Sequence, residues 1–232
     1  MAALVPTWYF NSMTAAKTLV LAVFSAAVAT AQSRTVPMMP AALTVDGVLV
    51  STVQHDGRDA LRIIEADNRR AGGMAVVNSQ FLRNGIIEVD VAGRRGPHAA
   101  ADDRGFIGIA FRVSSDRAGY ECIYLRPDNG RAEDQVRRNH SIQYSSHPDF
   151  PWPRMRKEFP EKYESYVDLQ PGAWTTMRIE MQDATARLFV QGNAQPNLIV
   201  NDLKLGASQG GIAFWIGPGT EGFFSNLRIT PR

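Results

Sequence analysis

The chain has 232 residues, of which 44% are hydrophobic and 21% are charged, and its formal net charge is +2. This length suits one large all-β domain, or one domain with additions, and the composition supplies enough apolar residues for a buried core. The small net charge argues against a dedicated nucleic-acid-binding protein, which usually carries a concentrated basic face. The most basic stretch, 131–138, also contains Glu133 and Asp134, so we interpret it as a solvated loop.

The first 31 residues have the pattern of a secretory signal peptide. Lys17 precedes an apolar run that is too short to span a bilayer comfortably, and this run ends in the small-x-small pattern of residues 29–31. Met13 fits as the natural start, which makes residues 1–12 an upstream extension. We therefore predict a secreted or periplasmic protein that is not stably inserted in a membrane after cleavage. A membrane anchor is the alternative.

The single cysteine, Cys122, excludes an intramolecular disulfide. An exported domain of this kind has to be stable from its core alone. Cys122 lies within an apolar run, and we predict a buried, unreactive thiol.

Residues 32–41 are predicted to be a tether, and from residue 42 onward short apolar runs alternate with turn residues. Most runs show the two-residue period of β-strands, and none keeps the 3.6-residue period of an amphipathic helix. Asp56-Gly57 between two runs predicts a tight hairpin. We predict strands at 49–53, 60–64, 74–77, 86–91, 106–113, 120–126, 174–181, 186–191, 198–200, 212–216 and 223–230. Such a series indicates an all-β sandwich or jelly roll, made of two antiparallel sheets.

Residues 128–172 form the one long irregular region of the chain. Loops of this length in a compact domain are usually functional or disordered. Its aromatic residues argue against disorder, because disordered segments contain few of them. We predict an ordered excursion that covers or walls a site within residues 42–232.

The rest of the domain is organised around residues 105–127, two apolar runs that flank a polar loop. Large apolar residues take every second position of the first run: Ile107, Ile109, Phe111 and Val113. Small residues, Gly108 and Ala110, lie between them and are followed by Arg112. A sheet face lined by such small residues leaves room for a ligand to lie on it.

The second run brings a polar and aromatic set close to Arg112: Tyr120, Glu121, Tyr124 and Arg126. Aromatic faces suit the C–H groups of a pyranose ring, and charged groups suit its hydroxyls. Two registers remain open. If Arg112 opposes Tyr120, then Tyr124 and Arg126 share its face; if it opposes Glu121, the two form a pair and Tyr124 turns to the core. A purely structural ion pair between Arg112 and Glu121 is the alternative to a ligand role.

Other candidates lie elsewhere in the chain. Tyr144 and Trp152, in the excursion, are predicted to bind a saccharide, although Trp152 is equally suited to pinning the excursion to the sandwich. Glu88 and Asp90 face the same way, and they suit acid–base catalysis, calcium binding or a solvated outer face. Calcium ligands from 102–103 and 128–130 lack the ordered spacing of a known site. We therefore predict no metal and no cofactor, with Ca²⁺ as the alternative.

The order of the motifs resembles the concanavalin A-like lectin/glucanase superfamily. The motifs that carry the resemblance are NGIIEVD (84–90), GIAFR (108–112), YECIYLR (120–126), WTTMRIE (174–180), GIAF (211–214) and FFSNLRI (223–229). Within this superfamily the chain is most similar to the secreted bacterial 3-keto-disaccharide hydrolase-like (laminin-G-like) group, which has a similar YE strand after a GI..R strand. The resemblance covers about residues 42–231. It implies a jelly roll with a site on its concave sheet.

Laminarinase-type glucanases of the superfamily carry E-x-D-x-x-E on one strand, which supplies two catalytic carboxylates. Here 88–90 reads EVD and 91–93 reads VAG, so the second glutamate is missing. The first hypothesis is therefore a different carbohydrate-active hydrolase, in which Glu121 is the acid–base residue and Arg112 and Arg126 hold the substrate. The second is a non-catalytic glycan-binding module, and the third is a structural or adhesion domain without a small ligand. The oligomeric state is not predicted.

Overall fold

The computed structural model describes residues 1–4, 32–67 and 70–232. Residues 31–232 form a compact unit. Residues 5–31, which contain most of the predicted signal peptide, lie outside the described part, so export stays a prediction. None of the helices described is long and apolar enough to cross a membrane.

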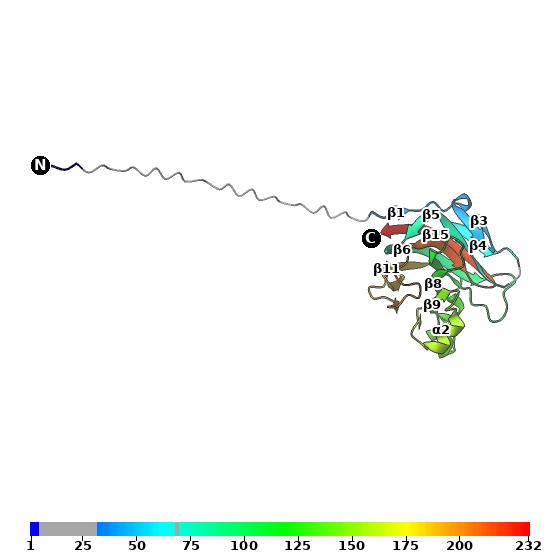
Figure 1. Cartoon of the computed structure of the whole chain (residues 1–232). Helices are drawn as coiled ribbons and strands as arrows, with labels where there is room; N and C mark the ends of the chain where they lie inside the picture. Colours follow the sequence, from blue (N-terminus) through cyan, green and yellow to red (C-terminus); the bar gives the residue numbers. More distant parts are fainter. Residues whose placement is uncertain (5–31, 68–69) are drawn as a thin grey trace. The chain divides into compact units, whose positions relative to one another are not determined.

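The domain is a sandwich of two antiparallel sheets (Figure 1). The eight-stranded sheet has the order β13 (Leu198–Val200), β12 (Thr185–Val190), β11 (Thr175–Gln182), β6 (Gly85–Arg95), β15 (Thr220–Pro231), β4 (Arg58–Glu65) and β3 (Val48–His55), and β1 (Arg34–Thr35) also pairs with β15. The seven-stranded sheet has the order β10 (Glu164–Ser165), β9 (Ile142–His147), β8 (Tyr120–Leu125), β7 (Ile107–Val113), β14 (Gly210–Ile216), β5 (Gly73–Leu82) and β2 (Leu43–Asp46). Short helices complete the domain: η1 (Pro40–Ala42), η2 (Pro127–Asn129), α1 (Gln135–Asn139) and α2 (Trp152–Glu158). The predicted all-β jelly-roll sandwich is confirmed.

The main core lies between the two sheets and takes alternate residues of every long strand. On β7 and β8, Ile109 and Ile123 face this core and are fully buried. The residues between them, such as Gly108 and Tyr124, therefore lie on the outer face of the seven-stranded sheet. That face, which points away from the core, is the one that the sequence predicted to be open for a ligand.

The structure resolves the register of the central hairpin. Phe111 pairs with Glu121, and Gly108 pairs with Tyr124. Tyr124 thus lies on the outer face, whereas Glu121 shares the core side with Phe111. Arg112 interrupts the alternation, because it has a φ of 54° and lies beside a register shift between β7 and β14. Asp56 and Gly57 both have positive φ, at 47° and 75°, as a tight hairpin requires.

Two sequence-based expectations need correction. The predicted tether, 32–41, contributes β1 to the eight-stranded sheet, and Val36 is buried in the main core. The excursion, 128–172, contains β9 and β10, which extend the seven-stranded sheet beyond β8. Both segments bury apolar side chains that are too few and too scattered to show a clear period in the sequence. In Figure 1, β8, β9 and α2 lie together at one end of the domain.

Candidate functional site

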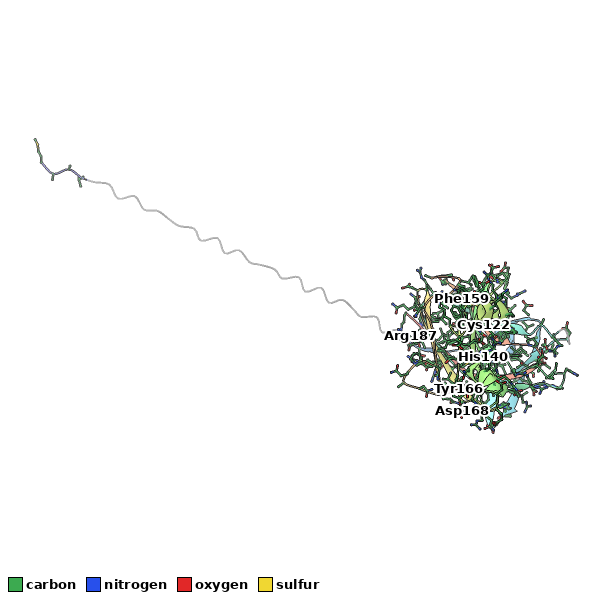
Figure 2. All side chains as sticks on the ribbon, turned by 90° about the horizontal axis from the view of Figure 1, so that it is seen from below. Cys122, His140, Phe159, Tyr166, Asp168 and Arg187 are labelled. Carbon is green, nitrogen blue, oxygen red and sulfur yellow. The ribbon has the colours of Figure 1, made fainter. Side chains whose placement is uncertain are left out.

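A cavity of about 600 Å³ lies on the outer face of the seven-stranded sheet. Strands β8, β9 and β14 supply its floor with Tyr124, Ser145, His147 and Trp215. Its walls come from loops and from the excursion, which spans the side of the domain seen in Figure 2. The wall residues are Arg70, Ala71, Asp102, Asp103, Arg104, Phe106, Asn129, Arg137, His140, Pro151, Trp152, Pro153, Arg156 and Pro218. This size falls in the range of small-molecule sites, roughly 300–1,000 Å³.

Aromatic rings form the apolar part of the floor. The rings of Tyr124 and Trp215 lie 4.8 Å apart between centroids, and Phe106 meets Tyr124 edge-on at 6.3 Å. Gly108 permits this arrangement, because a Cβ at that position would lie 2.3 Å from the carbonyl oxygen of Ile123 and 2.6 Å from the Cβ of Tyr124. The small residue predicted to make room for a ligand therefore first makes room for the adjacent strand and its tyrosine.

Arg126 is the centre of the polar part of the site. Its Nη1 donates to Glu164 Oε1 and to the carbonyl of His140, both at 3.0 Å. Its Nη2 donates to Tyr124 Oη at 3.1 Å and to Gln143 Oε1 at 2.9 Å. The Arg126 side chain is only 5% exposed and that of Glu164 only 3%. This network holds the hydroxyl of Tyr124 and one wall of the cavity in a single arrangement.

Trp152 forms one wall and starts helix α2. A proline lies on each side of it. Pro151 is the N-cap of the helix, and Pro153 falls in the first turn, where the fixed φ of proline suits a helix. The Arg156 guanidinium lies 4.9 Å from the ring centroid, and that of Arg126 lies 5.9 Å away. Arg156 also bonds to Glu164, its Nε lying 3.0 Å from Oε2. Trp152 is 46% exposed, so its ring is accessible to a ligand.

The charges around this network set its protonation states. Burial tends to raise the pKa of Glu164, but the hydrogen bond from Arg156 and the charge of Arg126 outweigh burial and hold it below the ordinary 4.5. Burial lowers the pKa of His140 despite the neighbouring Glu164 carboxylate, and burial also lowers the pKa of His147. Both imidazoles are therefore neutral at pH 7.

We expect Glu164 to contribute stability that depends on pH. Because its pKa is lower in the folded protein than in the unfolded chain, its contribution is present above an ordinary pKa of 4.5 and is lost as pH falls through the folded value. The difference in unfolding free energy between the parent and Glu164→Gln should therefore shrink on going from about pH 6 to about pH 3 in denaturant titrations. Glu158→Gln, which removes an exposed pair with Arg154, is the control and should show little dependence. A constant difference for Glu164→Gln would contradict this expectation.

The structure brings three of the predicted site residues together and leaves a fourth beside them. Tyr124, Arg126 and Trp152 line the cavity. Tyr120 lies just outside it and stacks on His147, with the ring centroids 4.5 Å apart. The remaining three, Arg112, Glu121 and Tyr144, lie on the core side of the same sheet.

Glu121 is fully buried and has structural partners for both oxygens. Tyr144 Oη donates to its Oε2 at 2.6 Å, and the backbone N–H of Leu205 donates to Oε1 at 2.7 Å. The N–H of Lys204 in turn donates to Tyr144 Oη at 2.8 Å. Burial is the main reason why the pKa of Glu121 is raised. The catalytic role expected from the sequence does not fit this position, because strand alternation turns Glu121 away from the cavity.

Arg112 joins three loops through their backbone carbonyls. Its guanidinium donates to the carbonyl oxygens of Gly206 and Asp183, and more weakly to that of Arg83 at 3.4 Å. Within the part of the chain that the structure describes, Arg112 forms no ion pair with Glu121. Neither the ligand role nor the ion-pair alternative describes it, and its role is to hold loops together.

The other candidate carboxylates, Glu88 and Asp90, also have partners within the protein. Asp90 accepts hydrogen bonds from Arg58, Thr176 and Asn226 at 2.6 to 3.0 Å, and Glu88 lies 3.8 Å from Arg228, so this strand face is a solvated outer face. Among the described residues, no group of three or more His, Cys, Asp or Glu side chains is placed to hold a metal ion. Cys122 is buried with its thiol reduced, and burial raises its pKa well above the ordinary value.

Sequence reasoning missed most of the cavity walls. The sequence contains one signal for the floor. Gln143, Ser145 and His147 alternate with residues of the core, so a strand predicted at 142–147 would have placed all three on one face. The arginines of the walls come from short or irregular segments, such as the loop that carries Arg104 and the five-residue helix α1 that carries Arg137, and neither segment shows a period in the sequence. Nothing in the sequence indicates that these segments meet.

Comparisons with known proteins identify the fold. No family model matches the chain, and no curated protein sequence matches it. A Bacillus subtilis protein of unknown function with a galectin-like fold has a TM-score of 0.54 at 11% identity, covering 83% of this chain and 92% of that one. Carbohydrate-binding module CBM66 from Bacillus subtilis has a TM-score of 0.53 at 8% identity, covering 80% and 96%. The exoplasmic/lumenal domain of VIP36, bound to Ca²⁺ and Man3GlcNAc, has a TM-score of 0.50 at 13% identity, covering 86% and 88%.

At such identities the likeness establishes the fold alone. It agrees with the concanavalin A-like jelly roll expected from the sequence motifs. It does not single out the 3-keto-disaccharide hydrolase-like group.

Proposed function

We propose that this protein is exported and binds a carbohydrate in the cavity on the outer face of its seven-stranded sheet. The observation that carries the proposal is the combination of an aromatic floor, Tyr124 and Trp215, with a fixed polar cluster around Arg126. Aromatic faces pack against the C–H faces of a sugar ring, and guanidinium and imidazole groups bond to its hydroxyls. Solved structures with this fold include a carbohydrate-binding module and the exoplasmic/lumenal domain of VIP36 in a form bound to Ca²⁺ and Man3GlcNAc, which supports the proposal.

Hydrolysis of the bound saccharide, including a 3-keto-glycoside, is the second candidate. The observation that favours it is the presence of titratable groups in the cavity, namely the imidazole of His140 and the exposed carboxylate of Asp102. A neutral imidazole at pH 7 can accept a proton. A structural or adhesion domain without a ligand is disfavoured, because it predicts an Arg112–Glu121 pair and no open pocket.

The test is saccharide binding by calorimetry, together with product analysis, for the protein without its first 31 residues. We expect Trp215→Ala to weaken binding by about tenfold or more, because it removes half of the aromatic floor. Glu121→Gln should bind as the parent does, since Glu121 lies outside the cavity. Thermal unfolding of each variant separates loss of the site from loss of the fold.

The outcomes separate the two candidates. Binding without turnover supports a binding protein. Turnover that survives Glu121→Gln and is lost in His140→Gln supports a hydrolase that acts in this cavity. If the parent binds no mono-, di- or polysaccharide of a broad panel, the carbohydrate proposal is wrong.

A further inference from the structure

The cavity is unusually rich in arginine for a protein with a net charge of only +2. Five arginines line it, against two aspartates. The arginines are Arg70, Arg104, Arg126, Arg137 and Arg156. A neutral sugar does not need such a concentration of positive charge, because neutral donors and acceptors can also satisfy its hydroxyls.

Three of these arginines already have carboxylate partners. Arg70 forms ion pairs with both aspartates of the cavity. Its Nη1 lies 2.9 Å from Asp103, and its Nη2 lies 3.3 Å from Asp102. Arg126 and Arg156 share the single carboxylate of Glu164. The group formed by Arg126, Arg156 and Glu164 therefore carries one net positive charge.

Arg104 and Arg137 have no such partner. Among the described residues, neither lies within 4 Å of a carboxylate oxygen. Arg104 Nη1 donates instead to the carbonyl oxygens of Ala101 and Asp103, at 2.7 and 2.8 Å, and Arg137 Nη2 reaches the carbonyl of Asp128 at 3.4 Å. Neutral carbonyls orient these guanidinium groups, and neither group is in direct contact with a carboxylate that would neutralise its charge.

The two unpaired arginines also repel each other. Burial lowers the pKa of Arg104 most, and the charge of Arg137 lowers it further. The carboxylates of Asp128 and Asp102 moderate this only in part. Asp128 also faces Arg95 and Arg137, and Asp102 is paired with Arg70. Two like charges held close together on one cavity wall are a cost that a bound anion would remove.

We infer that the cavity selects an acidic saccharide, and that Arg104 and Arg137 bind its carboxylate or sulfate group while Tyr124 and Trp215 pack against a sugar ring. Guanidinium groups match the planar geometry of a carboxylate and the oxygens of a sulfate through paired N–H donors. This inference rests on the proposed carbohydrate function and adds the chemical class of the ligand. The two sources of the anion, a uronic acid and a sulfate ester, share this chemistry.

The experiment compares acidic saccharides with neutral forms of the same backbone, using calorimetry at low salt. Oligogalacturonides are compared with their methyl esters, and sulfated carrageenan oligosaccharides with their desulfated forms. We expect one acidic member to bind at least tenfold more tightly than its neutral counterpart, and to lose affinity as salt is added. Preference for an oligogalacturonide would identify a carboxylate as the bound anion, and preference for a carrageenan oligosaccharide would identify a sulfate.

Variants then assign the preference to the cavity. The double variant Arg104→Gln, Arg137→Gln should reduce the preference for the acidic member to less than threefold, mainly because the acidic member binds less tightly. Arg95→Gln removes a nearby positive charge that does not line the cavity, and it should leave most of the preference intact. Melting temperatures close to that of the parent show that the variants are folded.

Three results would overturn the inference, and they are distinguishable. If neutral saccharides bind as tightly as their acidic counterparts, the acidic ligand is wrong and the carbohydrate function stands. If neither acidic nor neutral saccharides bind, the proposed function fails and the inference fails with it. A preference that is unchanged in the double variant would show that the anion binds elsewhere.

Discussion

Replacing Arg126 with leucine is expected to lower the free energy of unfolding by about 3 kcal/mol and to abolish saccharide binding. The substitution leaves the buried carboxylate of Glu164 with Arg156 and His140 as its remaining partners. It also removes the donor to the Tyr124 hydroxyl and to Gln143 Oε1. Removal of one partner from a buried ion pair is costly because the other charge stays out of water. Urea titration measures the stability, and calorimetry measures the binding.

A matched control for this change lies in the same excursion. Arg131 forms a two-pronged pair with Asp168, but both side chains are more than half exposed. Arg131→Leu should therefore cost less than about 1 kcal/mol and leave saccharide binding unchanged. If Arg126→Leu were no more harmful than Arg131→Leu, the network around Arg126 would not organise the site.

Replacing Arg112 with leucine is expected to cost roughly 3–5 kcal/mol, because three loop carbonyls lose their donor where water has little access. Arg112 is only 2% exposed, and its acceptors belong to Arg83, Asp183 and Gly206. These residues lie in three different connections, between β5 and β6, between β11 and β12, and between β13 and β14. The loss should appear as a lower urea midpoint for the whole domain.

Two further variants test whether this loss of stability comes from the hydrogen bonds of the Arg112 guanidinium. Arg112→Lys keeps a positive charge with fewer donors and should recover part of the stability. Arg187→Leu, on β12, replaces an exposed arginine and should stay within about 0.5 kcal/mol of the parent. Arg112→Lys should also bind saccharide as the parent does, because Arg112 lies on the core side of the sheet. An Arg112→Leu protein as stable as the parent would contradict the proposed role.

The contrast between Arg112 and Arg126 follows from one backbone feature. Strand alternation alone would place Arg112 on the same face as Ala110, the face that carries the cavity. The positive φ of Arg112 and the register shift beside it break this alternation, and the side chain reaches the loops instead. Arg126 directly follows β8, where the alternation is not interrupted, and its guanidinium lies beside the ring of Tyr124 on the cavity side.

The sequence by itself determined the elements whose information is local. The two-residue alternation of 107–113 and 120–126 predicted both strands of the central hairpin. Asp56-Gly57 predicted the turn between β3 and β4, since the two residues accept positive φ at little cost. The repeated short strands and turns were enough to predict an all-β sandwich, because each strand carries its own apolar face.

Only the tertiary structure decided which side chains meet. A shift of one residue in register exchanges the two faces of a strand, so the position of Glu121 depended on its pairing with Phe111. Strand β9 shows its alternation over only six residues of a region that otherwise has no period, and its pairing with β8 is a non-local contact.

The candidate site depends on such non-local contacts throughout. Arg126 and Glu164 are 38 residues apart in the chain. Arg104 comes from the loop between β6 and β7, whereas Arg137 belongs to helix α1 of the excursion. Charged side chains in loops follow no period, so the sequence shows only that the chain has many arginines. The packing of the excursion against the seven-stranded sheet is what gathers them around one cavity.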